Sequence, residues 1–415
     1  MTQKDIESVV EEVQSATVSD EYRPGNERWE MRPLSELMEP VLGKTPKRSE
    51  DKYWGGDIQW ASAKDISQSE TRHIYHTAEN MTESGREASN AKILPAGTVV
   101  VIARGATMGR VAQLAEPMAF NQTCYALDAN EQLLDDYLYY AWQYVFGQVQ
   151  AVSYGTVFDS ITMKSFKDIE IPLPPKAVQR HIANHLAKFD DLIESRHMIA
   201  SHLRDIAKEE FNRRFVEYEP YTDFKKTEEG KIPENFQLKE FGKISQNHDS
   251  KREPLSQAER EERPGEIPYY GATGPLSWID DYKFDGKYLL IAEDGSVKTD
   301  KGRPVLQFLN KKFWPSNHVH VVQGKDGVTT EFLRWALTDI PIEPYITGSV
   351  QPKVNQGNLN SIVIPVPPES DIQEFTQFVS KIHQLIWTDE NMIETASEAR
   401  DVLLPKLISG QIQLI

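Results

Sequence analysis

The chain repeats part of itself after 193 residues, and this duplication constrains its fold more than any other feature. The segment GTVFDSITMKSFKDIEIPLPP, which begins at Gly155, aligns without a gap with GSVQPKVNQGNLNSIVIPVPP, which begins at Gly348. A weaker match precedes it, because GDIQW at Gly56 resembles GEIPY at Gly265. A period of this length is typical of a duplicated domain rather than of a solenoid. We therefore expect two similar domains.

A heptad pattern follows each Pro-Pro pair of the duplicated segment. Its apolar residues recur alternately every three and four positions over about four heptads, which is typical of a coiled-coil seam. The first predicted seam is Val178, Ile182, Phe189, Leu192, Ile199, Leu203 and Ile206, with His185 and Arg196 in polar slots. The second is Ile372, Phe375, Val379, Ile382, Ile386, Ile393, Ala396, Leu403 and Leu407, with Asp389 and Arg400 in polar slots. We expect the two helices to pair; the alternative is that each packs only on its own domain.

Short aliphatic runs bounded by glycine precede each heptad segment. Residues 97–103 and 288–292 favour strands, and residues 135–145 and 330–337 favour short helices. The predicted fold class is α+β, with two duplicated mixed α/β domains joined by two long helices that form an antiparallel coiled coil. The predicted parts are an acidic tail (1–25), a first domain (26–175), a central helix (176–216), a polar linker (217–232), a second domain (233–368) and a C-terminal helix (369–415).

Composition narrows the classes of function. The 415 residues include 63 Asp or Glu and 46 Lys or Arg, a net charge of −17. This argues against a protein that coats nucleic acid indiscriminately but allows local basic patches. The acidity fits either a high-salt environment or an acidic face for a partner. The single cysteine, Cys124, excludes an internal disulfide and indicates a reducing cytoplasm. No apolar run approaches the roughly 20 residues of a membrane span, so no membrane partner is expected.

Catalytic motifs are missing from the sequence. It contains neither a Gly-x-x-x-x-Gly-Lys-Ser/Thr phosphate loop nor a Gly-x-Gly-x-x-Gly turn after a strand. His181 and His185 are four residues apart, but the Glu that a zinc protease needs after the first His is absent. His318 and His320 alternate on a predicted strand, where a polar strand face is a simpler explanation than a metal site. We therefore expect no catalytic residue, no cofactor and no metal in this chain.

Basic and aromatic residues interleave in several predicted loops, against an acidic background. Lys and Arg neutralise phosphates, whereas Arg, Asn, Gln and Thr can read base edges. For each residue the alternative is a solvated surface charge, or a structural turn for Thr156 and Ser349. The DNA contacts predicted in the first half are Lys44, Lys47, Arg48, Lys52, Tyr53, Trp54, Arg72, His73, Arg104, Thr107, Arg110, Gln122 and Thr156. Those predicted in the second half are Lys251, Arg252, Tyr269, Tyr270, Thr273, Lys298, Lys301, Arg303, Asn317, His318, Ser349 and Lys353.

The duplicated motifs resemble those of the specificity subunits of Type I restriction–modification systems. The resemblance covers essentially the whole chain after the acidic tail. One residue, Gln373, lies one position further from its Pro-Pro pair than Gln179 does, which predicts a different first turn for the second helix. The motifs that carry the resemblance are Ile171-Pro-Leu-Pro-Pro175 with Gln179 and Ile182, Ile364-Pro-Val-Pro-Pro368 with Gln373, Gly230-Lys-Ile-Pro-Glu234, and the terminal Arg400-Asp-Val-Leu-Leu-Pro-Lys-Leu-Ile-Ser-Gly410.

The resemblance implies that each domain is a target recognition domain that reads one half of a split, asymmetric DNA sequence. The coiled coil would set the spacer between the half-sites and dock the methyltransferase subunits. The chain would be a non-catalytic subunit that binds double-stranded DNA. Its partners would methylate adenine with S-adenosylmethionine, and a restriction subunit, whose presence stays open, would use ATP and Mg²⁺. A scaffold or adaptor with degenerate DNA-binding domains is the alternative, and the missing motifs disfavour a self-contained enzyme.

Overall fold

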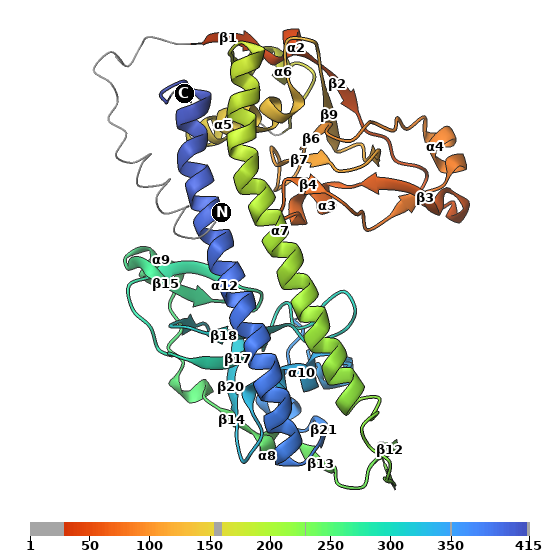
Figure 1. Cartoon of the computed structure of the whole chain (residues 1–415), viewed down its shortest axis with the longest axis vertical. Coiled ribbons are helices and arrows are strands. Elements are labelled where there is room, and N and C mark those ends of the chain that lie inside the picture. Colours follow the sequence, from red (N-terminus) through yellow and green to blue (C-terminus); the bar gives the residue numbers. More distant parts are fainter. Residues whose placement is uncertain (1–28, 153–159, 229, 349–350, 413–415) are drawn as a thin grey trace. The chain divides into compact units, whose positions relative to one another are not determined.

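The computed structural model describes residues 29–152, 160–228, 230–348 and 351–412. The chain forms two compact units, Met1–Ala200 with Thr388–Ile415, and Ser201–Trp387. Each unit holds one mixed α/β domain and a part of each of the two long helices (Figure 1). The predicted acidic tail at 1–25 lies outside the described residues. Among the described helices, none has the length and apolar character needed to cross a bilayer.

The two domains share most of one order of elements, although the first has α3, β4 and α4 and the second has α9 before β15. The elements of the first are β1 (Glu30–Pro33), α2 (Leu34–Leu37), β2 (Met38–Leu42), η1 (Asp51–Tyr53), β3 (Trp54–Ala61), α3 (Ala63–Gln68), β4 (His73–Ile74), β5 (Asn80–Met81), α4 (Glu83–Ser89), β6 (Val99–Ile102), β7 (Val111–Leu114), β8 (Ala119–Phe120), β9 (Cys124–Ala129), α5 (Asp135–Val152), α6 (Ser165–Asp168) and β10 (Glu170–Leu173). Those of the second are β13 (Gln237–Glu240), α8 (Phe241–Ile244), β14 (Ser245–Asn247), η2 (Asp249–Lys251), α9 (Gln257–Glu261), β15 (Pro264–Tyr270), β16 (Pro275–Ile279), β17 (Lys287–Ala292), β18 (Leu306–Asn310), β19 (Trp314–Pro315), β20 (Val319–Gly324), α10 (Thr330–Thr338), η3 (Glu343–Tyr345), α11 (Gln356–Asn360) and β21 (Val363–Val366).

The sheet topology confirms the predicted duplication. The central sheet has the order β2-β9-β6-β7-β4 in the first domain and β14-β20-β17-β18 in the second, so its first four strands correspond. The smaller sheets, β5-β3-β8 and β16-β15-β19, correspond as well, and each contains one parallel pair. The antiparallel pairs β1-β10 and β13-β21 link the start of each domain to the strand before its long helix.

Two matching glycines have the same role in the two copies. A Cβ atom on Gly56 in β3 would lie 2.6 Å from the Met81 backbone oxygen, and one on Gly265 in β15 would lie 2.3 Å from the Ile279 backbone oxygen. Neither position has room for a side chain, because a neighbouring strand passes close to it. The GDIQW and GEIPY motifs therefore mark equivalent places where two antiparallel strands approach closely.

The two long helices are α7 (Lys176–Phe215) and α12 (Glu369–Ile408), each of 40 residues. In the first unit, Asp190 and Arg196 of α7 bind Arg400 and Asp389 of α12, with N–O distances of 2.7 and 3.0 Å. Residue numbers thus rise along α7 as they fall along α12. Three of the polar residues predicted for the seams, Arg196, Asp389 and Arg400, thus pair with partners across it, whereas His185 contacts the backbone oxygen of His181 on its own helix.

The second unit keeps the same direction with apolar contacts. The ring of Phe375 on α12 lies 5.6 Å from that of Phe211 and 5.5 Å from that of Phe215, both on α7. Beside these rings, the Arg214 guanidinium is 3.0 Å from Glu374. These contacts, with those of the first unit, confirm that α7 and α12 pair as an antiparallel coiled coil.

The predicted phase of the first seam is wrong at alternate positions. Ile199 and Ile206 are 41% and 51% exposed, whereas Ala200 and Ala207 are buried at 1% and 0%. Hydrophobicity favours isoleucine over alanine, but a small residue lets two helices approach closely, and burial follows that geometry. The predicted His185, Leu192, Ile199 and Ile206 are replaced in the seam by their successors, Leu186, Ile193, Ala200 and Ala207.

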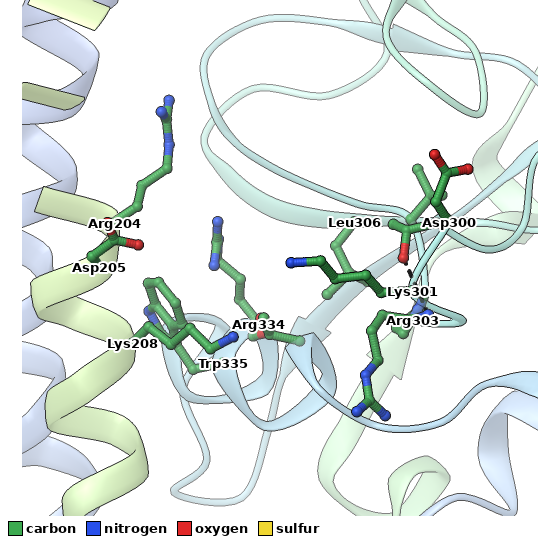
Figure 2. Close-up of a pocket in the computed structure, with 13 residues that line it drawn as sticks. Arg204, Asp205, Lys208, Asp300, Lys301, Arg303, Leu306, Arg334 and Trp335 are labelled. Atoms are coloured by element: carbon green, nitrogen blue, oxygen red, sulfur yellow. Dashed lines mark hydrogen bonds between the residues drawn. The ribbon is translucent and has the colours of Figure 1, made fainter. Parts of the chain in front are cut away.

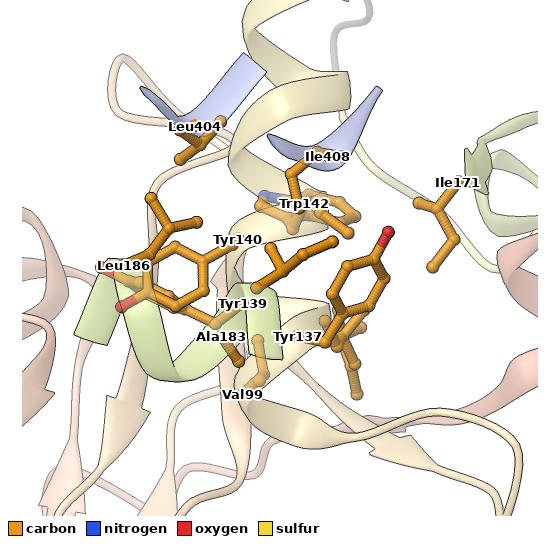
Figure 3. Packing of buried hydrophobic residues seen from close by; sticks show 14 of the residues in the cluster. Val99, Tyr137, Tyr139, Tyr140, Trp142, Ile171, Ala183, Leu186, Leu404 and Ile408 are labelled. Atoms are coloured by element: carbon orange, nitrogen blue, oxygen red, sulfur yellow. The ribbon is translucent and has the colours of Figure 1, made fainter. Parts of the chain in front are cut away.

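The core of the first unit lies between its central sheet and the two long helices. Figure 3 shows Tyr137, Tyr140 and Trp142 of α5 in this layer, among Leu186 of α7 and Leu404 of α12. All three aromatic side chains are at most 1% exposed. In the second domain α10 occupies the equivalent place. The predicted short helices are thus confirmed, although α5 extends to residue 152.

The predicted polar linker contains a hairpin. Strands β11 (Phe224–Thr227) and β12 (Gly230–Pro233) pair antiparallel, and the ammonium of Lys231 lies 4.5 Å from the ring centre of Phe224. These strands carry mostly polar residues, so the alternation of apolar and polar residues that predicts a strand is weak here.

Candidate nucleic-acid interface

Predicted contacts of the first domain gather at one end of its central sheet. Lys44, Arg104 and Gln122 each stand two residues from an end of β2, β6 or β9, and these three strands are antiparallel neighbours. Their residues therefore meet at the same end of the sheet. Thr107 and Arg110 lie in the loop between β6 and β7 at that end. We call Lys44, Arg104, Thr107, Arg110 and Gln122 the first rim; Thr107 is half-buried and the others are exposed.

The second domain has an equivalent second rim at the same end of the corresponding strands. Its residues follow β14, precede β20 and occupy the loop between β17 and β18. Lys353 joins them because it pairs with Asp294, just after β17. The second rim consists of Lys251, Arg252, Lys298, Lys301, Arg303, Asn317, His318 and Lys353. Thr273 is exposed but belongs to the separate loop between β15 and β16.

The loop beside the first rim is held by two indoles. The guanidinium of Arg48 lies 4.3 Å from the ring centre of Trp54 and 4.9 Å from that of Trp60, and it also pairs with Glu79. The Trp60 indole donates to the backbone oxygen of Lys44 at 2.9 Å. Trp60 is buried and was not predicted, although its place in the GDIQW motif is a usable signal. The loop is therefore fixed, and leaves Lys44, Lys47 and Lys52 exposed.

A buried ionic network lies under the second rim. Glu293 accepts from Arg252 at 2.8 Å and from Lys353 at 2.9 Å. His320, which is 1% exposed, is 2.6 Å from Asp249 through Nδ1 and 2.8 Å from the backbone oxygen of Val354 through Nε2. Both ring nitrogens thus face acceptors, which favours the doubly protonated imidazolium.

The same network bears on whether His318 and His320 could hold a metal ion. Asp249, Glu293 and His320 offer three possible ligand atoms within 4.8 Å of one another. The positive charges of Arg252 and Lys353 already neutralise Glu293, so a cation would have to displace them. His318 lies outside this group, because its Nδ1 pairs with Asp294. We therefore treat the group as an ion-pair network that supports the rim.

One family model matches the chain twice, once over each of the two domains. The model described as Type I restriction modification DNA specificity domain matches residues 26–203 and 233–395. The chain belongs to this family. The resemblance predicted from the motifs is thereby confirmed.

Relatives of this specificity subunit span its length. The MjaIX specificity subunit of Methanocaldococcus jannaschii is 25% identical over 93% of this chain and 94% of its own. The EcoprrI specificity subunit of Escherichia coli is 26% identical over 81% of this chain and 83% of its own. The crystal structure of the S subunit from M. genitalium has a TM-score of 0.55 and 16% identity, and covers 95% of this chain and 99% of that one. The last comparison supports the fold.

Three residues predicted to contact DNA in the specificity subunit are buried, and these assignments are wrong. Arg72 is 4% exposed and donates to the hydroxyl of Tyr140 at 3.2 Å, with further bonds to Gln113 and Asp136. Tyr269 and Tyr270 are 1% and 6% exposed. Their side chains belong to the core, where no ligand reaches them.

Another predicted contact, His73, fastens the first domain to α7. Its backbone N–H donates to Glu194 at 2.8 Å, its Nδ1 lies 2.9 Å from the same carboxylate, and the Tyr75 hydroxyl donates to that carboxylate at 2.8 Å. Although burial opposes the change, the bonds from His73 and Tyr75 lower the pKa of Glu194. Predicted contacts Thr156 and Ser349 lie outside the described residues.

The predicted difference in the first turn of the two helices is wrong. Both α7 and α12 begin at the residue after their Pro-Pro pair. Gln179 is buried and its amide binds three backbone groups, on Leu134, Gln132 and Pro174. The residue in the equivalent register of α12 is Ile372, which is also buried, whereas Gln373 is exposed. The glutamine of the motif therefore has a structural role only in the first copy.

The network under the second rim should make stability depend on pH. Although burial opposes the change, Asp249 and Glu293 raise the pKa of His320 above its ordinary 6.5. The stabilisation by the imidazolium is then fully present below pH 6.5 and lost as the pH rises through the raised pKa. At pH 6, we expect His320→Gln to lower the Tm by about 5 °C, the order for removing one partner of a buried ion pair. The difference in Tm between wild type and variant should shrink between pH 6.5 and 9.

The carboxylates of that network, Asp249 and Glu293, should make stability depend on pH in the opposite direction. Their bonds to His320 and Arg252 lower the pKa values of Asp249 and Glu293 against the effect of burial. Their stabilisation is present above the ordinary values of 3.8 and 4.5 and lost as the pH falls through the lowered ones. Thermal melts of His202→Gln, which changes an exposed histidine of α7, provide the control. If the difference in Tm between wild type and His320→Gln stayed constant from pH 6.5 to 9, the assignment of an imidazolium would be contradicted.

Proposed function

We propose that each domain of this specificity subunit reads one half of a bipartite, asymmetric DNA sequence through its rim. The observation that carries the proposal is that the two rims occupy the same end of equivalent sheets but present different side chains. The first rim offers Arg104, Arg110 and Gln122, and the second offers Lys301, Asn317 and His318, among others. Equivalent frames with different polar groups suit the reading of two different sequences in one mode.

The paired helices would set the spacer between the half-sites and dock the methyltransferase subunits. This chain would supply no catalytic group of its own. S-adenosylmethionine would be used by the methyltransferase partners, and ATP with Mg²⁺ by a restriction subunit where the system has one, all in the cytoplasm. The predicted metal-free character of the chain is consistent with a role in which it contributes recognition alone.

A methylation map of host DNA tests this proposal. Long-read sequencing would compare cells that carry the gene with cells from which it is deleted. We expect one split, adenine-methylated motif to disappear on deletion, because the specificity subunit directs its partners to that motif. The map would reveal both half-sites and the spacer in one measurement. Complementation with the intact gene controls for effects on neighbouring genes and should restore the motif.

An unchanged map in cells that express the methyltransferase partners would count against a role in recognition. The chain would then be a scaffold or adaptor, for which its net charge of −17 is the argument. Copurification with methyltransferase subunits without any sequence preference for DNA would support that alternative.

A further inference from the structure

A cationic cleft of about 600 Å³ lies in the second unit beside the second rim. It is formed by α7, α10 and the loop between β17 and β18. Figure 2 shows the side chains of Arg204 from α7, Arg334 from α10 and Lys301 from the loop extending into the space between these elements. Lys208 and Arg303 also line it, and the only acidic residues in the lining are Asp205 and Asp300. Five cations and two carboxylates thus line the described part of the cleft, and one of the cations, Lys208, pairs with Asp339 at 2.8 Å.

The positive potential of this cleft acts on a neighbouring buried group. His383 of α12 is 4% exposed, and neither of its ring nitrogens has a hydrogen-bond partner among the described residues. Burial first, and then the charges of Arg334, Lys287 and Arg204, lower its pKa to about 3. Two cations of the cleft, Arg334 and Arg204, therefore disfavour a further positive charge at this buried position.

The first unit lacks three of these cations, so the fold does not require them. The repeat of 193 residues places Ser397 at the position of Arg204 and Asp401 at that of Lys208. Ala141 stands where Arg334 stands, while the neighbouring Trp142 and Trp335 match. The scaffold is thus shared and the charge is not, which points to a ligand of the second unit rather than to a need of the helix packing.

We infer that the cleft binds phosphates of the DNA backbone, so that α7 itself is part of the DNA interface in the second unit. This inference rests on the proposed function and extends it from the rims to a helix of the coiled coil. Lys301 and Arg303 belong both to the second rim and to the cleft, so one DNA strand that follows the rim reaches the cleft. Guanidinium and ammonium groups bind phosphates without reading bases, so the cleft adds affinity but no sequence preference.

The test uses the full-length chain with its copurified methyltransferase subunits and two duplexes, one with the mapped motif and one without it. The double variant Arg204→Ser with Arg334→Ala installs the residues that the first unit carries. We expect it to weaken binding to both duplexes by the same factor, and to reduce the slope of log K against log salt by about 1 to 2, because each phosphate contact contributes about 0.9. The specificity ratio between the duplexes should not change.

The matched control is Arg180→Ser with Lys188→Ser, which removes two exposed cations from α7 in the first unit. It changes the net charge equally and should leave the slope as in the wild type. Since the cleft variant could disturb folding, Arg204→Lys with Arg334→Lys keeps both charges and should retain the slope. Lys301→Ser provides a third readout that leaves both helices intact, and should lower the slope by about 1.

A slope that is the same in the cleft variant and the wild type overturns the inference. It is also overturned if ATP or pyrophosphate binds the wild type but not the variant while the DNA slope is unchanged, because the phosphate would then belong to a small ligand. Failure of the proposed function looks different, since the wild type itself would not distinguish the two duplexes.

Discussion

Replacing Arg400 by methionine is expected to lower the free energy of unfolding of the first unit by about 3 kcal/mol, the order found when one partner of a buried ion pair is removed. Arg400 Nη1 lies 2.7 Å from Asp190, whose side chain is only 2% exposed. Tyr140 donates a second bond to the same carboxylate. Although burial opposes the change, Asp190 and Asp401 raise the pKa of Arg400, so the guanidinium stays charged. Without the guanidinium, Asp190 would keep its burial and lose its main counter-charge.

Denaturant unfolding with hydrogen exchange on α5 peptides would measure this loss in the unit concerned. The double variant Asp190→Asn with Arg400→Met should recover much of the stability, because the penalty comes from an uncompensated charge rather than from lost packing. Arg86→Met removes the exposed pair with Glu83 and should cost far less, because solvent screens exposed ion pairs. Equal losses in the single and double Arg400 variants would show that packing, and not charge, is what Arg400 supplies.

The second unit stabilises the equivalent position by different means. The repeat places His383 where the first unit has Asp190, and Ala207 where it has Arg400. His383 lies among aromatic rings, with Phe308 at 4.7 Å and Trp387 at 5.8 Å between ring centres. One copy thus fixes its domain against the helices with ion pairs and the other with an aromatic cluster.

The duplication could be predicted because both copies bury the same frame. The backbone constrains the residues around each Pro-Pro pair. It also constrains Gly56 and Gly265, where a neighbouring strand passes too close for a side chain, so these positions match despite divergence elsewhere. The seam of α12 was predicted in the right phase, since most of its buried residues are large. The seam of α7 was not, because Ala200 and Ala207 are buried there beside exposed isoleucines. Composition alone does not show where two helices come closest.

The individual residues of the rims could be picked out from the sequence, but their gathering at one end of a sheet could not. Lys44, Arg104 and Gln122 are far apart in the sequence, and only the strand order β2-β9-β6 brings them together. The same pattern of basic and aromatic residues misassigned Arg72 and Tyr269, because a polar or aromatic type does not reveal which face of a strand it occupies. The cleft was missed because α7 was treated as a coiled-coil helix, so its cations were not among the predicted DNA contacts.

Inserting one heptad into each long helix is expected to widen the spacer of the methylated motif by about three base pairs. Seven residues add about 10 Å to a helix at 1.5 Å per residue, and base pairs are stacked about 3.4 Å apart. The insertions belong where the units divide, between Ala200 and Ser201 in α7 and between Trp387 and Thr388 in α12. A full heptad in both helices keeps every seam residue facing its partner, so the pairing survives.

The two half-sites should remain as they are, because the rims are untouched, and the methylation map would then read only the change in length. Inserting seven residues into the segment 217–223, after the end of α7, adds the same length without lengthening the coil and should leave the spacer unaltered. A heptad in one helix alone shifts the seam against its partner, and we expect methylation to be lost. A motif with its original spacer in cells that carry the matched insertion would refute the idea that the coil sets the distance. Recognition would then depend on how each domain meets DNA independently of α7 and α12.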